Sequence, residues 1–374
     1  MEENKHELLT QQYSTWGDKL LQHTDVLHAM QHERIIKPIT VQLAPIEACD
    51  SDCPFCSVAA RPIKTYLPFA KIQQILKDFK DLGAKSLELT GGGNPLLYRD
   101  RETKQNINDV IKYANSLGYD IGIITNSHSF KKWLDPAVYD MIDWIRISLI
   151  QLDEGKKPED YDFNGYPYEK LAFSYIIYDG QTDDNGNYVA DELSRTNRVY
   201  QGTSVETIEN IAKLVNLHPE IKFVRLAGNC LIKGNNAAVK DRWKEIVDKV
   251  DELNKFFIKD IGYDDSPYND GCYVGMIRPY VAPAPHGGTY NVYACTSHVL
   301  EKRVYDEEWA ICSVDNIKES WDKMNTQFRE KGYPYEVKNN KGKNWCSSCK
   351  FCYYKFNNKL LYTVANEMPD KNFA

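Results

Sequence analysis

Three cysteines near the N-terminus are spaced closely enough to share one inorganic centre. Cys49, Cys53 and Cys56 form a C-x3-C-x2-C motif that directly follows residues 39–44, where an alternating pattern predicts a β-strand. Three thiolates on so short a loop can bind one cuboidal iron–sulfur cluster and leave its fourth iron without a protein ligand. Three ligands of a zinc site are the alternative, although structural zinc needs four protein ligands and this loop offers three.

A glycine run indicates a ligand site next to this loop. Gly91, Gly92 and Gly93 lie at the end of a second predicted strand, residues 86–90, and Asn94 follows them. Glycine allows the backbone to approach a ligand closely. A plain turn is the alternative. A nucleotide phosphate loop is disfavoured because no Gly-Lys-Ser or Gly-Lys-Thr follows the run.

The order of these two motifs resembles the radical S-adenosylmethionine (SAM) superfamily. The resemblance rests on the cysteine spacing, on the aromatic Phe55 before the third cysteine, and on the glycine run after the next strand. It implies a [4Fe–4S] cluster whose open iron is chelated by the amino and carboxylate groups of SAM. It also implies that the reduced cluster cleaves SAM to a 5′-deoxyadenosyl radical, which abstracts a hydrogen atom from a substrate.

The same resemblance gives expected roles to individual residues. Phe55 is expected to pack against the adenine, and residues 91–94 are expected to hold the methionine amino group. Asn94 stands where the family usually has Glu, so its contact is expected through an uncharged amide oxygen. Asn126 and Ser148 lie at later strand ends, where the family places polar contacts to SAM. Each of these two is equally explained as an ordinary strand-end hydrogen bonder.

Strand and helix patterns alternate through most of the chain. Short apolar segments predict strands at residues 39–44, 86–90, 121–125, 144–149, 172–177 and 222–226. Periodic segments predict helices at residues 7–30, 69–82, 106–117, 205–217 and 237–256. Parallel strands need helical crossovers, so the fold class is α/β, with a partial (β/α)6 TIM-like barrel. Residues 179–192 are expected to form an acidic hairpin whose charges are solvated.

Three regions follow from this pattern. We predict an N-terminal helical extension in residues 1–38, the radical SAM partial barrel in residues 39–258, and a small cysteine-rich α+β domain in residues 259–374. The last boundary is placed where the composition shifts to Pro, Gly, Tyr and Cys.

The C-terminal region carries a second group of cysteines, Cys295, Cys312, Cys346, Cys349 and Cys352. Four thiolates can enclose a metal centre, and the arrangement resembles the twitch and SPASM auxiliary-cluster modules. We expect one auxiliary [4Fe–4S] cluster on Cys295, Cys312, Cys346 and Cys349, with Cys352 replacing one of them or staying free. Structural zinc is the alternative. Cys230 and Cys272 stand alone and are interpreted as buried thiols.

Composition limits the partners. The net charge of -7 disfavours a protein that binds nucleic acid through non-specific phosphate contacts. No segment of the sequence reaches the roughly 20 apolar residues of a membrane span, and the N-terminus lacks signal-peptide features, so a cytoplasmic location is expected. Residues 331–359 carry seven lysines against one Glu. They indicate either a solvated face or a docking patch for an acidic electron donor such as flavodoxin or ferredoxin.

The predicted function is therefore a radical SAM enzyme with oxidoreductase-like chemistry. The substrate is expected to be a small molecule, and a peptide- or nucleotide-modifying maturase is the alternative. A non-catalytic zinc-binding scaffold and a simple electron carrier are the rivals of other classes. His128, His286 and His298 are candidates for a general base by residue type, although a structural role is the simpler interpretation for each. The catalytic residues stay unassigned.

Overall fold

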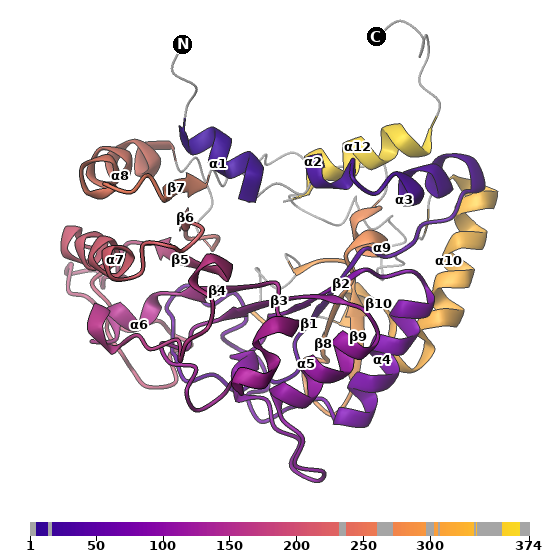
Figure 1. Cartoon of the computed structure of the whole chain (residues 1–374), viewed down its shortest axis with the longest axis horizontal. Coiled ribbons are helices and arrows are strands. Elements are labelled where there is room, and N and C mark those ends of the chain that lie inside the picture. Colours follow the sequence, from indigo (N-terminus) through magenta and orange to yellow (C-terminus); the bar gives the residue numbers. More distant parts are fainter. Residues whose placement is uncertain are drawn as a thin grey trace, which may run out of the picture.

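One ten-stranded sheet forms the centre of the computed structural model (Figure 1), in the order β10-β9-β8-β1-β2-β3-β4-β5-β6-β7. The structure describes residues 5–13, 17–231, 237–259, 272–296, 303–305, 307–332, 334 and 354–366. The strands are β1 (Thr40–Leu43), β2 (Ser86–Leu89), β3 (Asp120–Thr125), β4 (Trp144–Ser148), β5 (Leu171–Ile177), β6 (Val224–Gly228), β7 (Phe256–Lys259), β8 (Tyr280–Pro283), β9 (Tyr290–Tyr293) and β10 (Ala310–Ser313).

The sheet is mostly parallel. From β8 through β1 to β7 every neighbouring pair runs parallel, whereas β9 pairs antiparallel with both β8 and β10. Within the described ranges, no hydrogen-bonded ladder joins β7 to the other end of the sheet. This arrangement confirms the predicted α/β fold of a partial TIM-like barrel that remains open.

Helices connect and cover the strands. They are α1 (Lys5–Tyr13), α2 (Gly17–Leu20), α3 (Thr24–His28), α4 (Phe69–Asp81), α5 (Ile107–Ser116), α6 (Ile150–Asp153), α7 (Val205–Leu217), α8 (Ala237–Val250), α9 (Val274–Ile277), α10 (Ile317–Lys331) and α12 (Lys355–Ala365). In α4, a stripe of Ile72, Ile75, Leu76 and Phe79 is buried at helical spacing. Gly83, with a φ of 106°, lies just beyond the end of this helix.

The six strands predicted from sequence correspond to β1–β6, but two further parallel strands were missed. The helical pattern was extended to residue 256, whereas α8 ends at Val250 and β7 begins at Phe256. β8 lies in the segment assigned to the C-terminal region, yet it pairs with β1, with Gln42 opposite Tyr280. The sheet is therefore continuous across the predicted boundary, and the division into domains remains a prediction.

The N-terminal helices cover the end of the sheet where the parallel strands begin. Tyr13 of α1 packs against Phe223, just before β6, with ring centroids 4.3 Å apart and the rings tilted by 34°. Lys85, just before β2, forms an ion pair of 2.8 Å with Asp25 of α3. α12 lies beside α2 and the π-helical turn η1 (Ala29–Glu33), as Figure 1 shows. The single N-terminal helix expected over residues 7–30 is thus broken into shorter helices.

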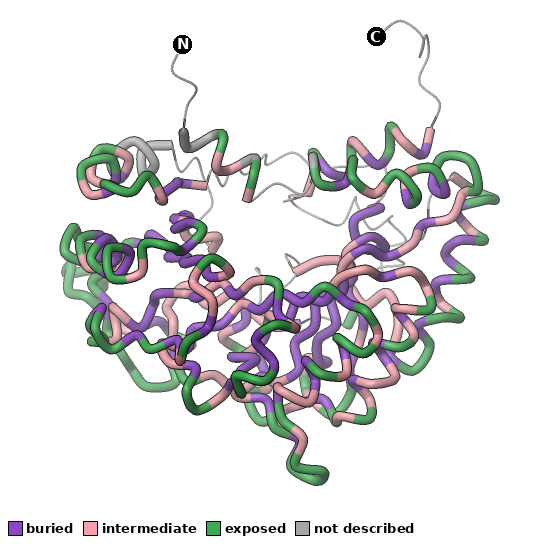
Figure 2. Tube along the Cα trace, in the orientation of Figure 1, coloured by how far each residue is buried: buried purple, intermediate pink, exposed green. Residues whose placement is uncertain are grey.

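Burial follows this architecture. The strands are mostly buried and the outer faces of the helices exposed, as the colours of Figure 2 show. No helix in the described part of the chain is both long enough and apolar enough to cross a membrane.

Candidate active site

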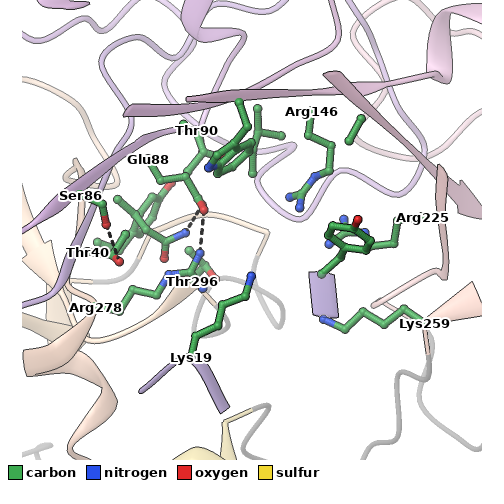
Figure 3. A pocket seen from close by; sticks show the side chains of 18 of the residues that line it. Lys19, Thr40, Ser86, Glu88, Thr90, Arg146, Arg225, Lys259, Arg278 and Thr296 are labelled. Carbon is green, nitrogen blue, oxygen red and sulfur yellow. Dashed lines mark hydrogen bonds and ion pairs between the residues drawn. The ribbon is translucent and has the colours of Figure 1, made fainter. Parts of the chain in front are cut away.

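A large cavity lies against the inner face of the curved sheet (Figure 3), with a volume of about 1330 Å³. Its walls come from alternate residues of successive strands, because side chains in a strand alternate between the two faces of the sheet. Small-molecule sites usually occupy about 300–1,000 Å³. This cavity therefore has room for more than one small ligand.

The cysteine loop lies at the mouth of the cavity, where β1 ends. Cys53, Phe55 and Cys56 line the cavity, and the Cys56 amide donates to the carbonyl of Cys53 at 3.1 Å. Cys49 lies behind them, with its Sγ 3.9 Å from Oδ1 of Asn126. Within the described ranges, no three His, Cys, Asp or Glu side chains converge on the position of a single metal ion. A cuboidal cluster binds each thiolate through a different iron, so its ligands surround a larger body than one ion.

Burial affects the chemistry of the three thiols. It raises the pKa of Cys49 to about 11, and Arg61 opposes this shift. Burial also raises the pKa of Cys53, and the neighbouring thiols Cys56 and Cys49 add to the effect. Because metal ligation requires thiolates, loading this loop with iron must release protons.

Arg61 stabilises the cysteine loop through several hydrogen bonds. Its buried guanidinium donates to the carbonyl of Glu47 at 2.8 Å, to Sγ of Cys56 at 3.3 Å and to the carbonyl of Val58 at 3.1 Å. A donor to a cysteine sulfur stabilises the thiolate form and tunes a bound cluster. This arginine was not predicted from sequence, although it lies only five residues after the third cysteine.

Arg303 binds the same loop from a distant part of the chain. It donates to the carbonyls of Cys56 at 2.9 Å and Pro54 at 3.2 Å, and its Nη1 contacts both carboxylate oxygens of Asp191, at 2.8 and 2.7 Å. Asp191 belongs to the hairpin predicted at residues 179–192. The tip of that hairpin is exposed, as expected, but Asp191 is buried. The expectation that its charges are all solvated is wrong for Asp191, because this carboxylate positions Arg303.

The segment after this hairpin closes over the outer side of the loop. Oδ1 of Asp52 lies 3.3 Å from Nε of Arg195, and its other oxygen accepts from the hydroxyls of Ser194 and Thr196, each at 2.7 Å. Arg195 also donates to the carbonyls of Cys49 and Ser51. The cysteine loop is thus held from two sides by sequence-distant arginines.

The glycine run packs directly against the cysteine loop. The amide of Gly93 donates to the carbonyl of Ile46 at 3.0 Å, and the amide of Asn94 donates to that of Ala48 at 2.8 Å. Gly91 and Gly92 line the cavity. A Cβ on Gly91 would lie 2.2 Å from the hydroxyl oxygen of Tyr280, so only glycine fits at this position.

Two tyrosines fix the backbone of the glycine run. The amide of Gly92 donates to the hydroxyls of Tyr305, at 3.1 Å, and Tyr280, at 3.3 Å. These hydroxyls are 2.9 Å apart, and Tyr305 also reaches the buried carboxylate of Glu47 at 3.5 Å. Neither tyrosine was recognised from sequence, since each is far from the run along the chain.

Asn94 is buried in a polar network behind the cavity. Its amide oxygen accepts from the amide of Leu96 at 3.2 Å and from the hydroxyl of Thr125 at 2.7 Å. Its amide nitrogen donates to Asp50 and Ser127. The role expected for Asn94 remains a proposal, and an ammonium group at its oxygen would have to replace one of these donors.

Asn126 joins the same network from the end of β3. Its nitrogen donates to Asp50 at 2.9 Å and to Ser51 at 2.6 Å, both in the cysteine loop. Ser148, at the end of β4, lines the cavity. Of the residues expected at the first cluster and at SAM, the cavity is thus lined by Cys53, Phe55, Cys56, Gly91, Gly92 and Ser148, but not by Cys49, Gly93, Asn94 and Asn126.

Residues 43–160 match the sequence model of the radical SAM superfamily. The chain contains a radical SAM domain. The matched segment includes both the cysteine loop and the glycine run, and it spans less than half of the chain. No curated protein matches the sequence of this chain.

Solved structures that resemble the whole chain are more distant. The chain is similar to Streptococcus suis SuiB bound to the precursor peptide SuiA, at 15% identity over 89% of this chain and 76% of that chain, with a TM-score of 0.48. It is similar to anSMEcpe with bound AdoMet, at 14% identity over 89% and 97%, with a TM-score of 0.41. It is also similar to BtrN in complex with AdoMet and 2-DOIA, at 12% identity over 79% and 87%, with a TM-score of 0.35. Likenesses this low carry no conclusion about substrate.

Of the three histidines considered as general bases, His128 and His286 lie within the described residues, and neither lines the cavity. Nδ1 of His128 contacts Oε1 of Gln151, which supports a structural role. His286 is exposed in the turn between β8 and β9. His298 lies outside the described residues.

The expected second cluster is only partly covered by the described residues. Cys312 lies in β10 opposite Val292 of β9, and Cys295 follows the end of β9. Both are partly buried, and burial raises the pKa of Cys312 to about 12. Cys346, Cys349 and Cys352 lie outside the described residues, so the auxiliary site remains a proposal.

A partly buried carboxyl group, that of Asp153, binds the tyrosine that packs against Phe55. Phe55 packs edge-on against Tyr178 at 5.1 Å. Oδ2 of Asp153 accepts from the hydroxyls of Tyr175 at 2.8 Å and Tyr178 at 3.2 Å. Burial raises the pKa of Asp153 from 3.8 to about 6 against these hydrogen bonds. The protonated form is therefore the one that the fold favours.

We expect Asp153→Asn to remove one pH dependence of stability. The pKa of Asp153 is higher in the folded protein than in the unfolded chain. The protonated carboxyl group therefore stabilises the wild type below pH 3.8, and this contribution is lost as pH rises through about 6. Relative to the variant, the wild type should lose about 2 kcal/mol of unfolding free energy between about pH 4 and pH 7. Urea unfolding of both proteins across this range measures the difference. A difference that stays constant would show that Asp153 titrates as in the unfolded chain.

Proposed function

We propose that this protein is a radical SAM enzyme that abstracts a hydrogen atom from a small-molecule substrate. The observation that carries the proposal is the backbone clamp between the cysteine loop and the glycine run at one cavity mouth, where Gly93 and Asn94 donate to the carbonyls of Ile46 and Ala48. Two motifs that are about forty residues apart in sequence therefore act on one ligand position.

The residues at the mouth fit a cluster with SAM bound to it. Two of the three thiols line the cavity, and thiolate is the ligand that iron–sulfur clusters prefer. Gly91 and Gly92 present their backbone to the cavity beside these thiols. A side chain on Gly91 would collide with Tyr280, and one on Gly92 would collide with Glu47. When bound, the reduced cluster and SAM supply a 5′-deoxyadenosyl radical that takes a hydrogen atom from the substrate.

The chain's own residues position these groups and exclude water. Cys49, Cys53 and Cys56 hold the cluster, and Arg61 stabilises the charge on Cys56. Phe55 offers an apolar face at the cavity. The helices at the strand beginnings cover the far end of the sheet, which keeps a reactive radical away from solvent.

The direct test is the cleavage of SAM by anaerobically reconstituted protein. With dithionite and SAM, we expect 5′-deoxyadenosine to accumulate and the protein to hold about eight irons if both clusters form. A non-catalytic zinc scaffold predicts abundant zinc, about four irons at most and no nucleoside product. A simple electron carrier predicts iron–sulfur clusters without SAM cleavage. Failure of a folded, iron-loaded sample to bind SAM would refute the proposal.

A small-molecule substrate is favoured over a peptide because the cavity is lined along its depth by the strands and is covered where the strands begin. A peptide or nucleotide substrate remains the second candidate. Hydrogen transfer from a substrate to 5′-deoxyadenosine, followed with deuterated candidates, separates these classes. We place the enzyme in the cytoplasm on the sequence features alone.

An auxiliary [4Fe–4S] cluster on the C-terminal cysteines and an acidic electron donor complete the proposal. We expect the triple reversal Lys350→Glu, Lys355→Glu and Lys359→Glu to slow reduction by flavodoxin about tenfold or more at low ionic strength. Lys355 and Lys359 lie on α12, and Lys350 lies outside the described residues. Stopped-flow reduction of the reconstituted protein measures the rate.

The control for this charge reversal changes three lysines on other helices, which are Lys112, Lys213 and Lys249. It should leave the reduction rate close to that of the wild type. Equal rates for wild type and the patch variant would remove the donor site from residues 331–359.

A further inference from the structure

A layer of positive charge lines the cavity below its mouth. Arg146 in β4, Arg225 in β6 and Lys259 at the end of β7 project from neighbouring walls into the same space (Figure 3). Of the described residues, seven Lys or Arg residues and two carboxylates, Glu88 and Asp120, line the cavity. The chain as a whole carries a net charge of -7. The charge of the cavity is thus opposite to that of the protein.

Among the described residues, the three cations have no anionic partner of their own. Within the described part of the chain, Arg146, Arg225 and Lys259 form no hydrogen bond and no ion pair, and Nε of each arginine is fully buried without a partner. Glu88 is the carboxylate that faces them, but it already binds Arg278 at 2.9 Å and Gln42 at 2.6 Å. Within the described ranges, the positive charge of these three side chains is therefore unmatched.

Such a layer is costly for the fold alone. Burial lowers the pKa of Arg146 and of Arg225, and Arg146 lowers that of Arg225 further. Burial lowers the pKa of Lys259 to about 8, and the charges of Arg225, Arg146 and Arg278 add to the effect. All three cations are partly buried. Partly buried cations without partners disfavour folding, and such violations of local rules concentrate at functional sites.

We infer that the cavity binds its substrate through an oxyanion group held by Arg146, Arg225 and Lys259. The group is a phosphoryl group or a cluster of carboxylates, since guanidinium forks match both in bidentate geometry. The identification of this ligand as the substrate rests on the proposed function. The anion site itself rests on the cavity.

The cationic layer lies below a residue expected to contact SAM. Arg146 precedes Ser148 by two residues in β4, which corresponds to about 7 Å along a strand. Both residues line the cavity, so the anion site and the expected SAM contact share one wall.

Anion binding tests this inference on the full-length, reconstituted protein. Pyrophosphate and citrate serve as the phosphoryl and carboxylate probes, and SAM is kept present so that the open iron is not available to either. Isothermal titration calorimetry should show binding to the wild type, weakened at least tenfold in Arg225→Gln and in Arg146→Gln. The exposed Arg329→Gln on α10 is the matched control and should bind as the wild type does. Tighter binding of pyrophosphate indicates a phosphorylated substrate, and tighter binding of citrate a polycarboxylate.

Thermal unfolding of the anion-free proteins separates binding from folding. Because Arg225 is unmatched, Arg225→Gln should unfold at a temperature no lower than the wild type, and pyrophosphate should raise the melting temperature of the wild type more than that of the variant. The inference is overturned if neither anion binds, if the variants bind as the wild type does, or if Arg225→Gln melts several degrees lower.

Production of 5′-deoxyadenosine by the same wild-type preparation keeps the two proposals apart. Nucleoside production without anion binding overturns the anion site alone. Anion binding without nucleoside production overturns the proposed function and leaves the anion site standing.

Discussion

Cys53→Ala should abolish production of 5′-deoxyadenosine, a fall of at least about 10³-fold. Cys53 lines the cavity between the other two cysteines of the loop in sequence. An alanine there leaves two thiolates for a cluster that needs three, so the cluster is not retained and SAM has no iron to bind. The iron content should fall by about four per chain, since the expected auxiliary cluster uses other cysteines.

The measurement is quantitation of 5′-deoxyadenosine together with iron and sulfide analysis after anaerobic reconstitution. Cys272→Ala is the matched control, because Cys272 is a partly buried thiol packed against the core. It should retain the iron and activity of the wild type. Full nucleoside production by Cys53→Ala would remove this loop from the chemistry.

Gly93→Ala should be the most damaging change in the glycine run. A Cβ on Gly93 would lie 1.9 Å from the carbonyl oxygen of Ala48 and 2.6 Å from the carbonyl carbon of Glu47. Both neighbours are backbone atoms of the segment that leads into the cysteine loop, so no side-chain rotation relieves the collision. We expect a loss of about 3 kcal/mol or more in unfolding free energy, and weaker retention of iron.

Urea unfolding of the metal-free protein measures this loss. Gly165→Ala is the matched control, since Gly165 has a φ of 74° and nothing within 4 Å of an added Cβ. Its cost is the backbone strain alone, about 1 kcal/mol. Equal midpoints for the two variants would show that the loops move apart readily, and would weaken the argument for one shared ligand position.

The parts of this site that could be predicted are those with local signals. The cysteine spacing and the glycine run are each contained in a few consecutive residues. β1–β6 have short apolar patterns between helical ones. β7 was missed because the helical pattern of α8 appeared to continue to Phe256, and β8 was missed because a four-residue strand ending in Pro283 has little pattern.

The residues that position the site could not be found this way, because their partners are far away along the chain. Tyr280 and Tyr305 meet Gly92 across 188 and 213 positions of sequence. The side of the sheet on which Arg146 lies could have been predicted in part from the strand pattern. In the pattern of residues 144–148, it stands between two isoleucines, and the alternation of a strand places it on the opposite face from them.

The place of β8 beside β1 has a consequence for the order of synthesis. A nascent chain that has reached only residue 258 contains the three cysteines but lacks β8, so β1 would be an unprotected edge strand. It would also lack Tyr280, Arg303 and Tyr305, which hold the cysteine and glycine loops. Iron delivered at that stage would meet an unsupported loop, and cluster insertion is therefore expected only after residues 280–305 have been synthesised.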